Sequence, residues 1–459
     1  MANKLFAPTD MTQGSVWKSI IKFTLPMLIG NIAQQLYSTV DTIVVGQYAE
    51  NGDNAIASVG SALPILNMLL VLFIGISAGA SVMVSQYYGA KNREALSFTV
   101  GNSITVTAIA CIGLVAVATP FIDPVLKLLN TPADIIEGCS DYLTISLIGI
   151  AGMAYYNILS GIIRGLGDSF SALIYLLVAT GVNIVLDIFF VATLALDVAG
   201  VAIATVIAQA VSSLLCLLKL AKMRQHFDFG LKFMRPKAQY VKTVIRLGLP
   251  SGLTQAIFSS AMIIVQSLTN SFGPQFIASN VVIMRVDGFA MMPNFSFGMA
   301  LTTFAGQNVG AGRYDRVQKG AKQGTLMAVC CSTVITIIIL LMGKHLMSVF
   351  TDTKEIVNMS YRLMMILAVG YIAVAVTQSL SGIMRGAGDT MTPMWISLIT
   401  TVAVRVPLAY GISFLTRTEK LPYGRCECIQ ISLLASWVIG ALLTVLFYKI
   451  GRWKKKRLA

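Results

Sequence analysis

Charge, histidine and closely spaced cysteines are all scarce in this sequence of 459 residues. Only 12% of the residues are charged, whereas a soluble domain carries about 25%. There are two histidines, His226 and His345, and seven cysteines, among which Cys426-x-Cys428 is the only spacing that suggests a metal site. A metal site would need further Cys or His ligands near that pair, and no nucleophile lies at a typical spacing from a base. The sequence therefore argues against a soluble protein, a zinc site and an enzyme.

Short segments of alternating hydrophobicity are also missing, which argues against a transmembrane β-barrel. Hydrophobic residues instead make up 56% of the chain, and the mean hydropathy is +0.76. They gather in blocks of about 20 residues or more, long enough to cross a bilayer as helices. We count twelve blocks, at 17–45, 56–84, 95–120, 135–160, 169–194, 197–220, 242–269, 276–306, 320–342, 357–383, 391–415 and 428–450. The pattern predicts an all-α integral membrane protein with twelve transmembrane helices.

The net charge of +14 would suggest nucleic-acid binding in a soluble protein, but its distribution indicates a topology instead. With twelve spans, one side of the membrane receives both termini and 25 of the 34 Lys and Arg residues, and the other side receives seven. Arg285 and Arg405 lie inside apolar blocks. By the positive-inside rule the basic side is cytoplasmic. We therefore expect a multi-pass protein of a bacterial or archaeal cytoplasmic (inner) membrane, in contact with the lipid bilayer and not with nucleic acid.

The chain repeats itself after 221 residues. "SGIIRGLGDS" at 160–169 matches "SGIMRGAGDT" at 381–390, and "QYYGAKNR" at 86–93 matches "QNVGAGRY" at 307–314. A polar, basic connection lies between the two copies. Each copy has six spans, so both enter the membrane from the same side as parallel repeats, a form found in secondary transporters. We predict an N-terminal lobe over 1–222, a cytoplasmic linker over 223–240 and a C-terminal lobe over 241–459.

The repeated Gly-x-Gly-Asp also occurs in presenilin-type intramembrane aspartyl proteases. Such an enzyme needs a second aspartate in an intramembrane Tyr-Asp, and the only Tyr-Asp here is Tyr314-Asp315 in a charged loop. The motif is better explained as a helix end followed by a helix start. Gly167 allows a tight turn, Arg164 suits a helix C-terminus, and Asp168 suits the N-cap of the next helix. The same roles apply to the second copy.

Three of the twenty acidic residues, Asp41, Asp187 and Asp287, fall inside apolar blocks. A charge there costs at least about 2.5–3.5 kcal/mol, so a functional role is the default interpretation. Asn183 precedes Asp187 by four residues, which places both on one helical face. Together with Asp41, and with Thr205 adding a hydroxyl, they can hold a proton by burial and like-charge repulsion or bind Na⁺ through oxygen ligands. Structural pairing with a neighbouring helix is the alternative.

The second half lacks this cluster, because Asn183 aligns with Val404 and Asp187 with Leu408. It carries Arg285, Asp287 and Arg405 instead. We expect Asp287 to pair with an intramembrane arginine, either as a structural or gating ion pair or in direct contact with substrate. The methionines near Asp287, including Met291, are flexible side chains that suit a surface accepting many shapes, although ordinary packing also accounts for them.

These motifs, at matching places in two six-helix halves, resemble the multidrug and toxic compound extrusion (MATE) family, and the resemblance covers essentially the whole chain. It implies two V-shaped lobes around a central cavity and efflux driven by inward H⁺ or Na⁺ flow. Spans 7 and 10 hold no acidic residue, unlike the NorM-like branch, so the DinF-like branch is favoured. That branch implies coupling roles for Asp41, Asn183, Asp187 and Thr205. The predicted substrate-cavity residues are Gln34, Tyr37, Asn157, Gln255, Met291 and Gln378.

The expected function is a cation-coupled antiporter that exports amphipathic, often cationic compounds by alternating access. H⁺ or Na⁺ is the coupling ion, no other cofactor is expected, and we expect a monomer. Pro26 gives the first helix a place to bend. The alternative is a flippase for lipid-linked precursors from the same superfamily, which would need a cationic cavity built from Arg285 and Arg405.

Overall fold

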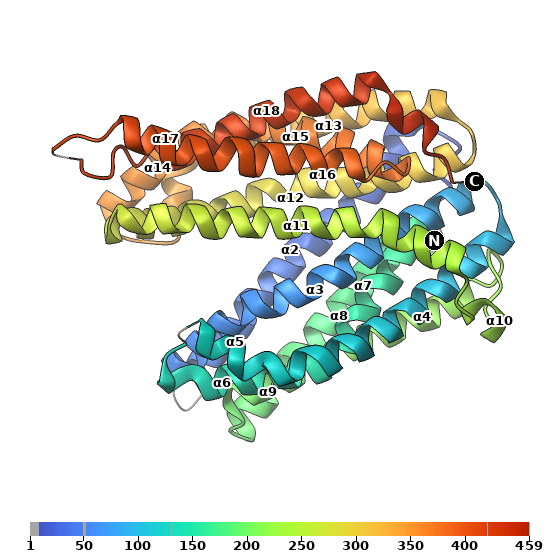
Figure 1. The fold of residues 1–459 in the computed structure, drawn as a ribbon, viewed down its shortest axis with the longest axis horizontal. Helices are drawn as coiled ribbons and strands as arrows, with labels where there is room; N and C mark the ends of the chain where they lie inside the picture. Colours follow the sequence, from blue (N-terminus) through green and yellow to red (C-terminus); the bar gives the residue numbers. More distant parts are fainter. Residues whose placement is uncertain (1–8, 49–51, 130, 420, 459) are drawn as a thin grey trace. The chain divides into compact units, whose positions relative to one another are not determined.

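The computed structural model describes residues 9–48, 52–129, 131–419 and 421–458, with the side chains at 36–43, 45–48, 52 and 53 outside that description. The described residues are helical apart from turns and one isolated bridge between Thr418 and Leu421. They fall into two compact units (Figure 1). Unit 1 comprises Leu25–Gly252 and the described end of the N-terminal segment, and unit 2 comprises Met11–Thr24 and Leu253–Leu458.

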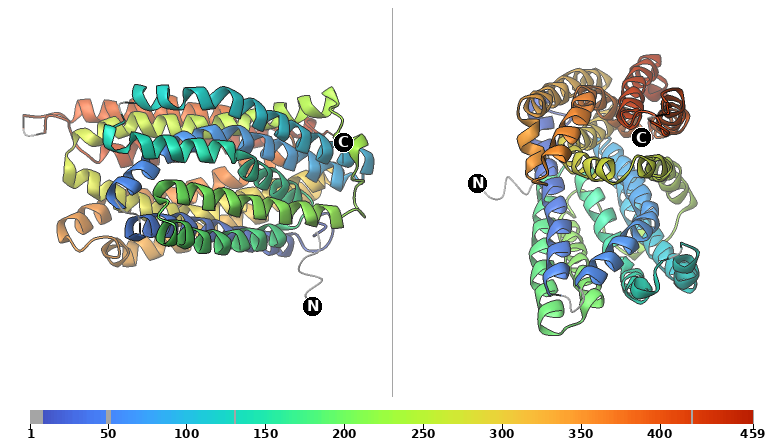
Figure 2. Two further views of the ribbon diagram at one scale, coloured as in Figure 1. Left: turned by 90° about the horizontal axis from the view of Figure 1, so that it is seen from below. Right: turned by 90° about the vertical axis from the view of Figure 1, so that its left-hand side faces the viewer.

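Within each unit the long helices run side by side (Figures 1 and 2). Unit 1 holds most of α2 (Val16–Tyr48), then α3 (Gly52–Gly89), α4 (Arg93–Ala118), η1 (Thr119–Phe121), α5 (Ile122–Leu128), α6 (Ala133–Ile148), α7 (Ile150–Gly165), α8 (Ser169–Asp187), η2 (Ile188–Thr193), α9 (Asp197–Lys222), α10 (Leu231–Met234) and the start of α11 (Ala238–Ser271). Unit 2 holds the rest of α11, then α12 (Pro274–Gly310), α13 (Tyr314–Ser348), α14 (Lys354–Ala368), α15 (Gly370–Gly386), α16 (Met391–Leu398), η3 (Ile399–Arg405), α17 (Val406–Leu415), α18 (Cys428–Ile450) and η4 (Arg452–Lys455).

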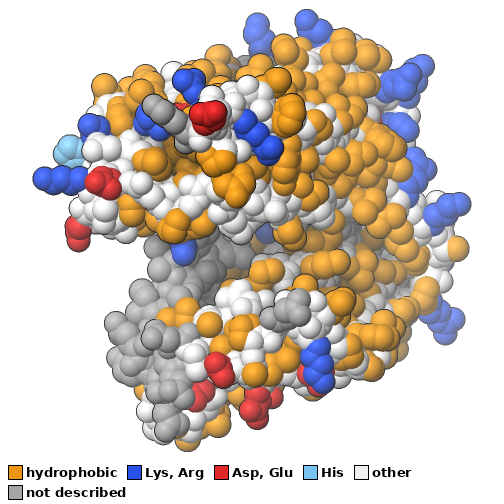
Figure 3. Space-filling model, turned by 60° about the vertical axis from the view of Figure 1, so that its left-hand side comes forward, with side chains coloured by type: hydrophobic (Ala, Val, Ile, Leu, Met, Phe, Trp, Pro, Cys, Tyr) orange, Lys and Arg blue, Asp and Glu red, His pale blue; other side chains and the backbone are white. Residues whose placement is uncertain are grey.

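The helices match the predicted spans. Among the described residues, nine helical segments are long and apolar enough to cross a membrane, and two bent pairs raise the number to eleven. Helix α2, with 33 residues, corresponds to the first predicted span. Figure 3 shows a broad hydrophobic surface with most Lys and Arg side chains toward its margins. The predicted all-α integral membrane fold is confirmed.

Two predicted spans, 135–160 and 357–383, are not single helices. Helices α6 and α7 meet at 51°, and α14 and α15 meet at 46°. Gly149 and Gly370, which are 221 residues apart, lie at the two bends. A Cβ atom at Gly149 would overlap the Val206 side chain, and one at Gly370 would lie 2.5 Å from the Trp437 ring. Glycine therefore lets a neighbouring helix pack directly against each bend, which a pattern of apolar residues does not reveal.

The two repeats pack their helices in the same register. In unit 1 the glycines Gly161 and Gly165 of α7 press against Ser77 and Ser81 of α3. In unit 2 their counterparts Gly382 and Gly386 of α15 press against Gly298 and Thr302 of α12. The 221-residue offset therefore describes equivalent three-dimensional contacts as well as similar sequence.

The repeated Gly-x-Gly-Asp motif ends one helix and starts the next, as predicted. Gly167 and Gly388 both have φ of +95°, which favours glycine. Asp168 Oδ1 accepts a hydrogen bond from the Ser171 backbone N–H at 2.9 Å, and Asp389 Oδ1 accepts one from the Thr392 N–H at 3.3 Å. In unit 1, Lys219 Nζ also lies 3.0 Å from Asp168 Oδ2.

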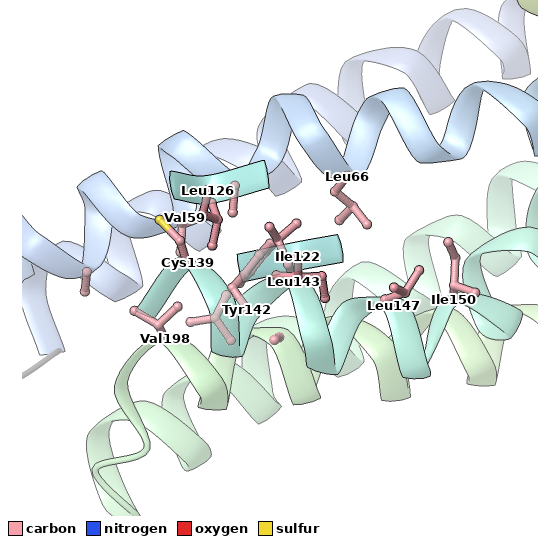
Figure 4. Packing of buried hydrophobic residues seen from close by; sticks show 14 of the residues in the cluster. Val59, Leu66, Ile122, Leu126, Cys139, Tyr142, Leu143, Leu147, Ile150 and Val198 are labelled. Atoms are coloured by element: carbon pink, nitrogen blue, oxygen red, sulfur yellow. The ribbon is translucent and has the colours of Figure 1, made fainter. Parts of the chain in front are cut away.

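Each unit has a buried apolar core. Figure 4 shows the core of unit 1, where Leu126, Tyr142 and Leu143 pack between helices with Val198 of α9. The core of unit 2 includes Tyr371 among its buried side chains. Residues of α9, α12 and α15, three of the elements that carry candidate site residues, belong to these cores.

The predicted linker is held against α4 inside unit 1. Thr105 Oγ1 donates to the Met234 carbonyl at 2.7 Å, and the Lys237 N–H donates to Asn102 Oδ1 at 2.7 Å. Arg93 Nη2 lies 2.7 Å from Asp228 Oδ1. The polar residues of α4 therefore serve to bind this connection.

Candidate functional site

Three of the predicted coupling residues come together inside unit 1. Helix α8 carries Asn183 and Asp187 one turn apart, and both are completely buried, while Thr205 of α9 is 5% exposed. Helices α8 and α9 pack against each other, and Asn183 Nδ2 donates to Thr205 Oγ1 at 3.5 Å. The arrangement puts a carboxylate, an amide and a hydroxyl within one buried cluster.

The backbone changes its winding directly after Asp187. Residues Ile188–Thr193 form a π-helical segment, η2, and the Leu194 N–H donates to the Phe189 carbonyl at 3.2 Å. Single π-turns within helices occur frequently at functional sites. Chemically, a buried carboxylate at such a point is suited to take up a proton, and its oxygen atoms together with those of Asn183 and Thr205 are the ligand type that hard cations prefer.

The remaining predicted residues of unit 1 are placed unevenly. The side chains of Tyr37 and Asp41 lie outside the described residues, so their predicted roles stay predictions. Gln34 is exposed on α2. Asn157 is half-buried on α7 and donates its Nδ2 to the Met153 carbonyl at 2.8 Å, while its own carbonyl accepts a hydrogen bond from Ser77 Oγ at 2.6 Å. One of its two amide N–H groups is therefore already used within α7.

In unit 2 the structure places Asp287 beside a tyrosine. Tyr371 of α15 donates its hydroxyl to Asp287 Oδ1 of α12 at 2.9 Å. Arg405, at the end of η3, interacts electrostatically with Asp287, but the two form no ion pair within 4.0 Å. Arg285 is exposed. The structure therefore does not show the expected ion pair between Asp287 and an arginine. Tyr371 makes the direct contact with Asp287 instead.

The predicted cavity residues of unit 2 lie on three helices. Gln255 is exposed on α11, Gln378 is half-buried on α15, and Met291 of α12 is 9% exposed. Gln378 is the 221-residue counterpart of Asn157, and its backbone packs against Gly298.

Sequence reasoning did not identify Tyr371. The residue is completely buried, its ring lies 5.7 Å from that of Trp437, and its hydroxyl also lies 3.6 Å from Met364 Sδ. A difference between the repeats could have identified it: the residue that corresponds to Tyr371 in the first half is Ile150, which has no polar group. A tyrosine hydroxyl in an apolar span needs a partner, and Asp287 provides it.

The family model MatE matches residues 26–189 and again residues 250–411, which together exceed half of the chain. The chain belongs to the MatE family. Both matches begin at the proline of a repeat's first helix, Pro26 in α2 and Pro250 in α11. The MatE match therefore repeats the duplication found in the sequence and the structure.

Two relatives named for multidrug resistance align along almost their full length. The chain is 29% identical over 451 residues to "Probable multidrug resistance protein YoeA" of Bacillus subtilis, covering 97% of this chain and 96% of that one. It is 26% identical over 451 residues to "Probable multidrug resistance protein NorM" of Thermotoga maritima, covering 96% and 93%. A crystal structure described as "MATE in the straight conformation" has a TM-score of 0.89 at 23% identity, covering 98% of this chain and 100% of that chain. That structure shows the shared fold, and the predicted DinF-like branch stays a prediction.

Proposed function

We propose that this protein is a cation-coupled antiporter that exports amphipathic, often cationic organic compounds by alternating access. Its similarity to proteins named for multidrug resistance supports the export role. The single observation that carries the coupling is the buried cluster of Asn183, Asp187 and Thr205. The second repeat has the same fold with Val404 and Leu408 at the matching positions. The polar cluster is therefore not a requirement of the fold.

In this mechanism H⁺ or Na⁺ binds at Asp187, with Asn183 and Thr205 as neighbouring oxygen donors and Asp41 as the predicted fourth group. Binding cancels the buried negative charge, which is costly within a membrane span. The change in charge then alters the packing of α2, where Pro26 removes one helical hydrogen bond and provides a bend. Movement of the units exposes the substrate to the other side. The Lys and Arg distribution supports cytoplasmic termini in a bacterial or archaeal inner membrane.

The flippase alternative has less support. It needs cationic side chains that face a shared cavity, whereas Arg405 is 7% exposed and interacts with Asp287. Only Arg285 among the two intramembrane arginines is exposed. We also propose no catalytic activity, because the sequence places no nucleophile at a typical spacing from a base.

The test uses purified protein in liposomes loaded with ethidium, with an imposed pH gradient or an imposed Na⁺ gradient in separate arms. The variant is Asp187→Asn, which keeps the shape of the side chain and removes its charge. The matched control is Asp134→Asn, an exposed carboxylate on α6 of the same unit.

We expect gradient-driven export by the unmodified protein and by Asp134→Asn, and export at the level of empty liposomes for Asp187→Asn. The gradient that drives export identifies the coupling ion. Normal gradient-driven export by a folded Asp187→Asn protein would refute the coupling role, and the absence of export under either gradient would refute the proposed function.

A further inference from the structure

The end of α18 and the residues after it carry a dense group of positive charges, residues 449–457, which we call the C-terminal basic segment. Six of these nine residues are Lys or Arg, and the last acidic residue of the sequence is Glu427, before α18 begins. None of the three ion pairs within 4.0 Å among the described residues involves the segment. All six basic side chains are exposed: Lys449, Arg452, Lys454, Lys455, Lys456 and Arg457.

The segment is folded against unit 2. Gly451 ends α18 with φ of +75°, a conformation that favours glycine. In η4, which follows, Trp453 is 1% exposed, its ring stacks on that of Tyr448 at 5.3 Å, and its Nε1 donates to the Tyr448 carbonyl at 3.0 Å. Arg457 Nη2 donates to the carbonyl of Gly310, the last residue of α12, at 2.8 Å. Two anchored residues therefore hold the three lysines between them.

The exposed apolar side of α18 leads directly into the segment. Its residues follow one another at intervals of four, which places them along one side of the helix, and all are exposed: Val438, Leu442, Leu446 and Ile450. Helix α18 is long and apolar enough to cross a membrane, so this side suits the hydrocarbon of the bilayer. Lys and Arg at the end of such a helix lie at the level of the lipid headgroups.

The first repeat arranges the equivalent part of its chain differently. The residues after α9, its sixth span, also include Lys and Arg, but Asp228 lies among them and pairs with Arg93 of α4. No run of three basic residues occurs in residues 223–240. Because the first repeat closes its helix bundle without such a run, the three adjacent lysines after α18 do not follow from the shared fold.

The chemistry of the segment suits an anionic phospholipid. Phosphate oxygens accept charge-assisted hydrogen bonds from Lys and Arg, and basic clusters next to a membrane span attract anionic lipids, with a gain of about 5-fold in affinity for each residue. A free phosphate or a nucleic acid would use only the charges. A lipid also places its acyl chains along the apolar side of α18, beside Leu446 and Ile450. The continuity of the two surfaces therefore favours a lipid.

We propose that the C-terminal basic segment is a binding site for the headgroups of anionic phospholipids. Lys454, Lys455 and Lys456 contact the phosphate, and the acyl chains lie along α18. Trp453 is a positioning residue that fixes the segment at the end of the helix. In the topology proposed above, these lipids belong to the cytoplasmic leaflet. The site concerns unit 2 alone and does not depend on export, so its failure and the failure of the proposed function are separate results.

The experiment titrates the purified full-length protein in neutral detergent with dioleoyl phosphatidylglycerol or dioleoyl phosphatidylcholine and counts bound lipid by native mass spectrometry. The charge variant combines Lys454→Gln, Lys455→Gln and Lys456→Gln. The matched control removes three other exposed lysines of unit 2, by Lys18→Gln, Lys319→Gln and Lys322→Gln. Trp453→Leu keeps every charge and removes the anchor. Glycerol 3-phosphate and a single-stranded oligonucleotide serve as soluble competitors, and circular dichroism reports folding.

We expect the unmodified protein to bind phosphatidylglycerol at least about 10-fold more tightly than phosphatidylcholine. The charge variant should bind phosphatidylglycerol at least about 10-fold more weakly, with phosphatidylcholine binding changed by less than about 2-fold. The control variant should bind both lipids within about 2-fold of the unmodified protein. Trp453→Leu should bind phosphatidylglycerol about 3- to 10-fold more weakly, because the segment must then be ordered on binding. Higher ionic strength should weaken phosphatidylglycerol binding.

Equal affinity of the unmodified protein for the two lipids would overturn the inference, as would equal losses in the charge variant and the control variant. Displacement of the lipid by glycerol 3-phosphate or by the oligonucleotide at comparable concentrations would show a site for soluble anions and refute the lipid assignment. Unchanged binding by a folded Trp453→Leu protein would refute the positioning role. If Trp453→Leu does not fold, the comparison of the charge variant with its control decides.

Discussion

The crossing of α12 and α15 makes a quantitative prediction for Gly386→Ala. A Cβ atom at residue 386 would overlap the carbonyl oxygen of Thr302 and lie 2.9 Å from both Ala305 Cβ and Gly306 N. Two of these three atoms belong to the backbone, so no side-chain rotation relieves the contact. The two helices must separate locally. By contrast, a Cβ at Gly411 in α17 meets no atom within 4 Å, which makes Gly411→Ala a matched control.

The magnitude follows from comparing the two variants. Replacing glycine by alanine favours a helix by up to about 1 kcal/mol. Gly411 lies inside α17 and Gly386 is the last residue of α15, so this contribution cancels in part. Overpacking of a close contact costs about 1–3 kcal/mol, and only Gly386→Ala incurs it. For a folding unit of about 200 residues, 1 kcal/mol changes the melting temperature by about 2–4 °C. Gly386→Ala should therefore melt about 2–12 °C below Gly411→Ala.

The assay is thermal unfolding in detergent, followed by intrinsic tryptophan fluorescence. All four tryptophans, at positions 17, 395, 437 and 453, belong to unit 2. The signal therefore reports the unit that contains both substitutions. Equal melting temperatures for the two variants would show that α12 and α15 are not packed at the distance seen here, and would refute the account of the repeated glycines.

Other predictions concern the loop after each repeat's second helix and the linker. Lys91 has φ of +55°, and its counterpart in the second repeat, Gly312, has φ of +71°. Because this backbone conformation favours glycine, Lys91→Gly should stabilise the protein by about 0.5–1 kcal/mol and Gly312→Ala should destabilise it by about 1–2 kcal/mol. Melting temperatures measure both effects. The hydrogen bond from Arg93 lowers the pKa of Asp228, so the linker contact is complete above the ordinary aspartate pKa and is lost as the pH falls through the lowered pKa. A spin label at the exposed position 232 should become mobile at that low pH, and Arg93→Gln should make it mobile already at neutral pH. A label equally immobile in Arg93→Gln would contradict the role of this contact.

Most of the fold was predictable because membrane solvation imposes a simple rule. Backbone groups in hydrocarbon must bond within their own helix, so each long apolar block had to be helical. The repeat then fixed which helices correspond, as the equivalent contacts of Gly161 and Gly382 show. Asp168 and Asp389 were identifiable as caps because aspartate at a helix start bonds the next exposed N–H groups.

The bends and π-segments were not predictable, because they depend on tertiary contacts. Gly149 is one glycine among 38, and only the structure shows that it lies at a bend with Val206 of α9 packed directly against it. Likewise, Arg93 and Asp228 lie 135 residues apart, and the sequence indicated only that both lie on the basic side. In the candidate site, the spacing of Asn183 and Asp187 was enough to predict that they share a helical face. The hydrogen bond between Tyr371 and Asp287 could not be predicted, because it depends on how α15 packs on α12.

The duplication itself separates what the fold needs from what function needs. Cys139 and Ser360 occupy equivalent positions, and each donates to the carbonyl of an equivalent serine, Ser58 or Ser279. Contacts of this kind are kept in both halves because the packing depends on them. The polar groups at Asp187 and at Asp287 have no such counterpart, so neither follows from the packing.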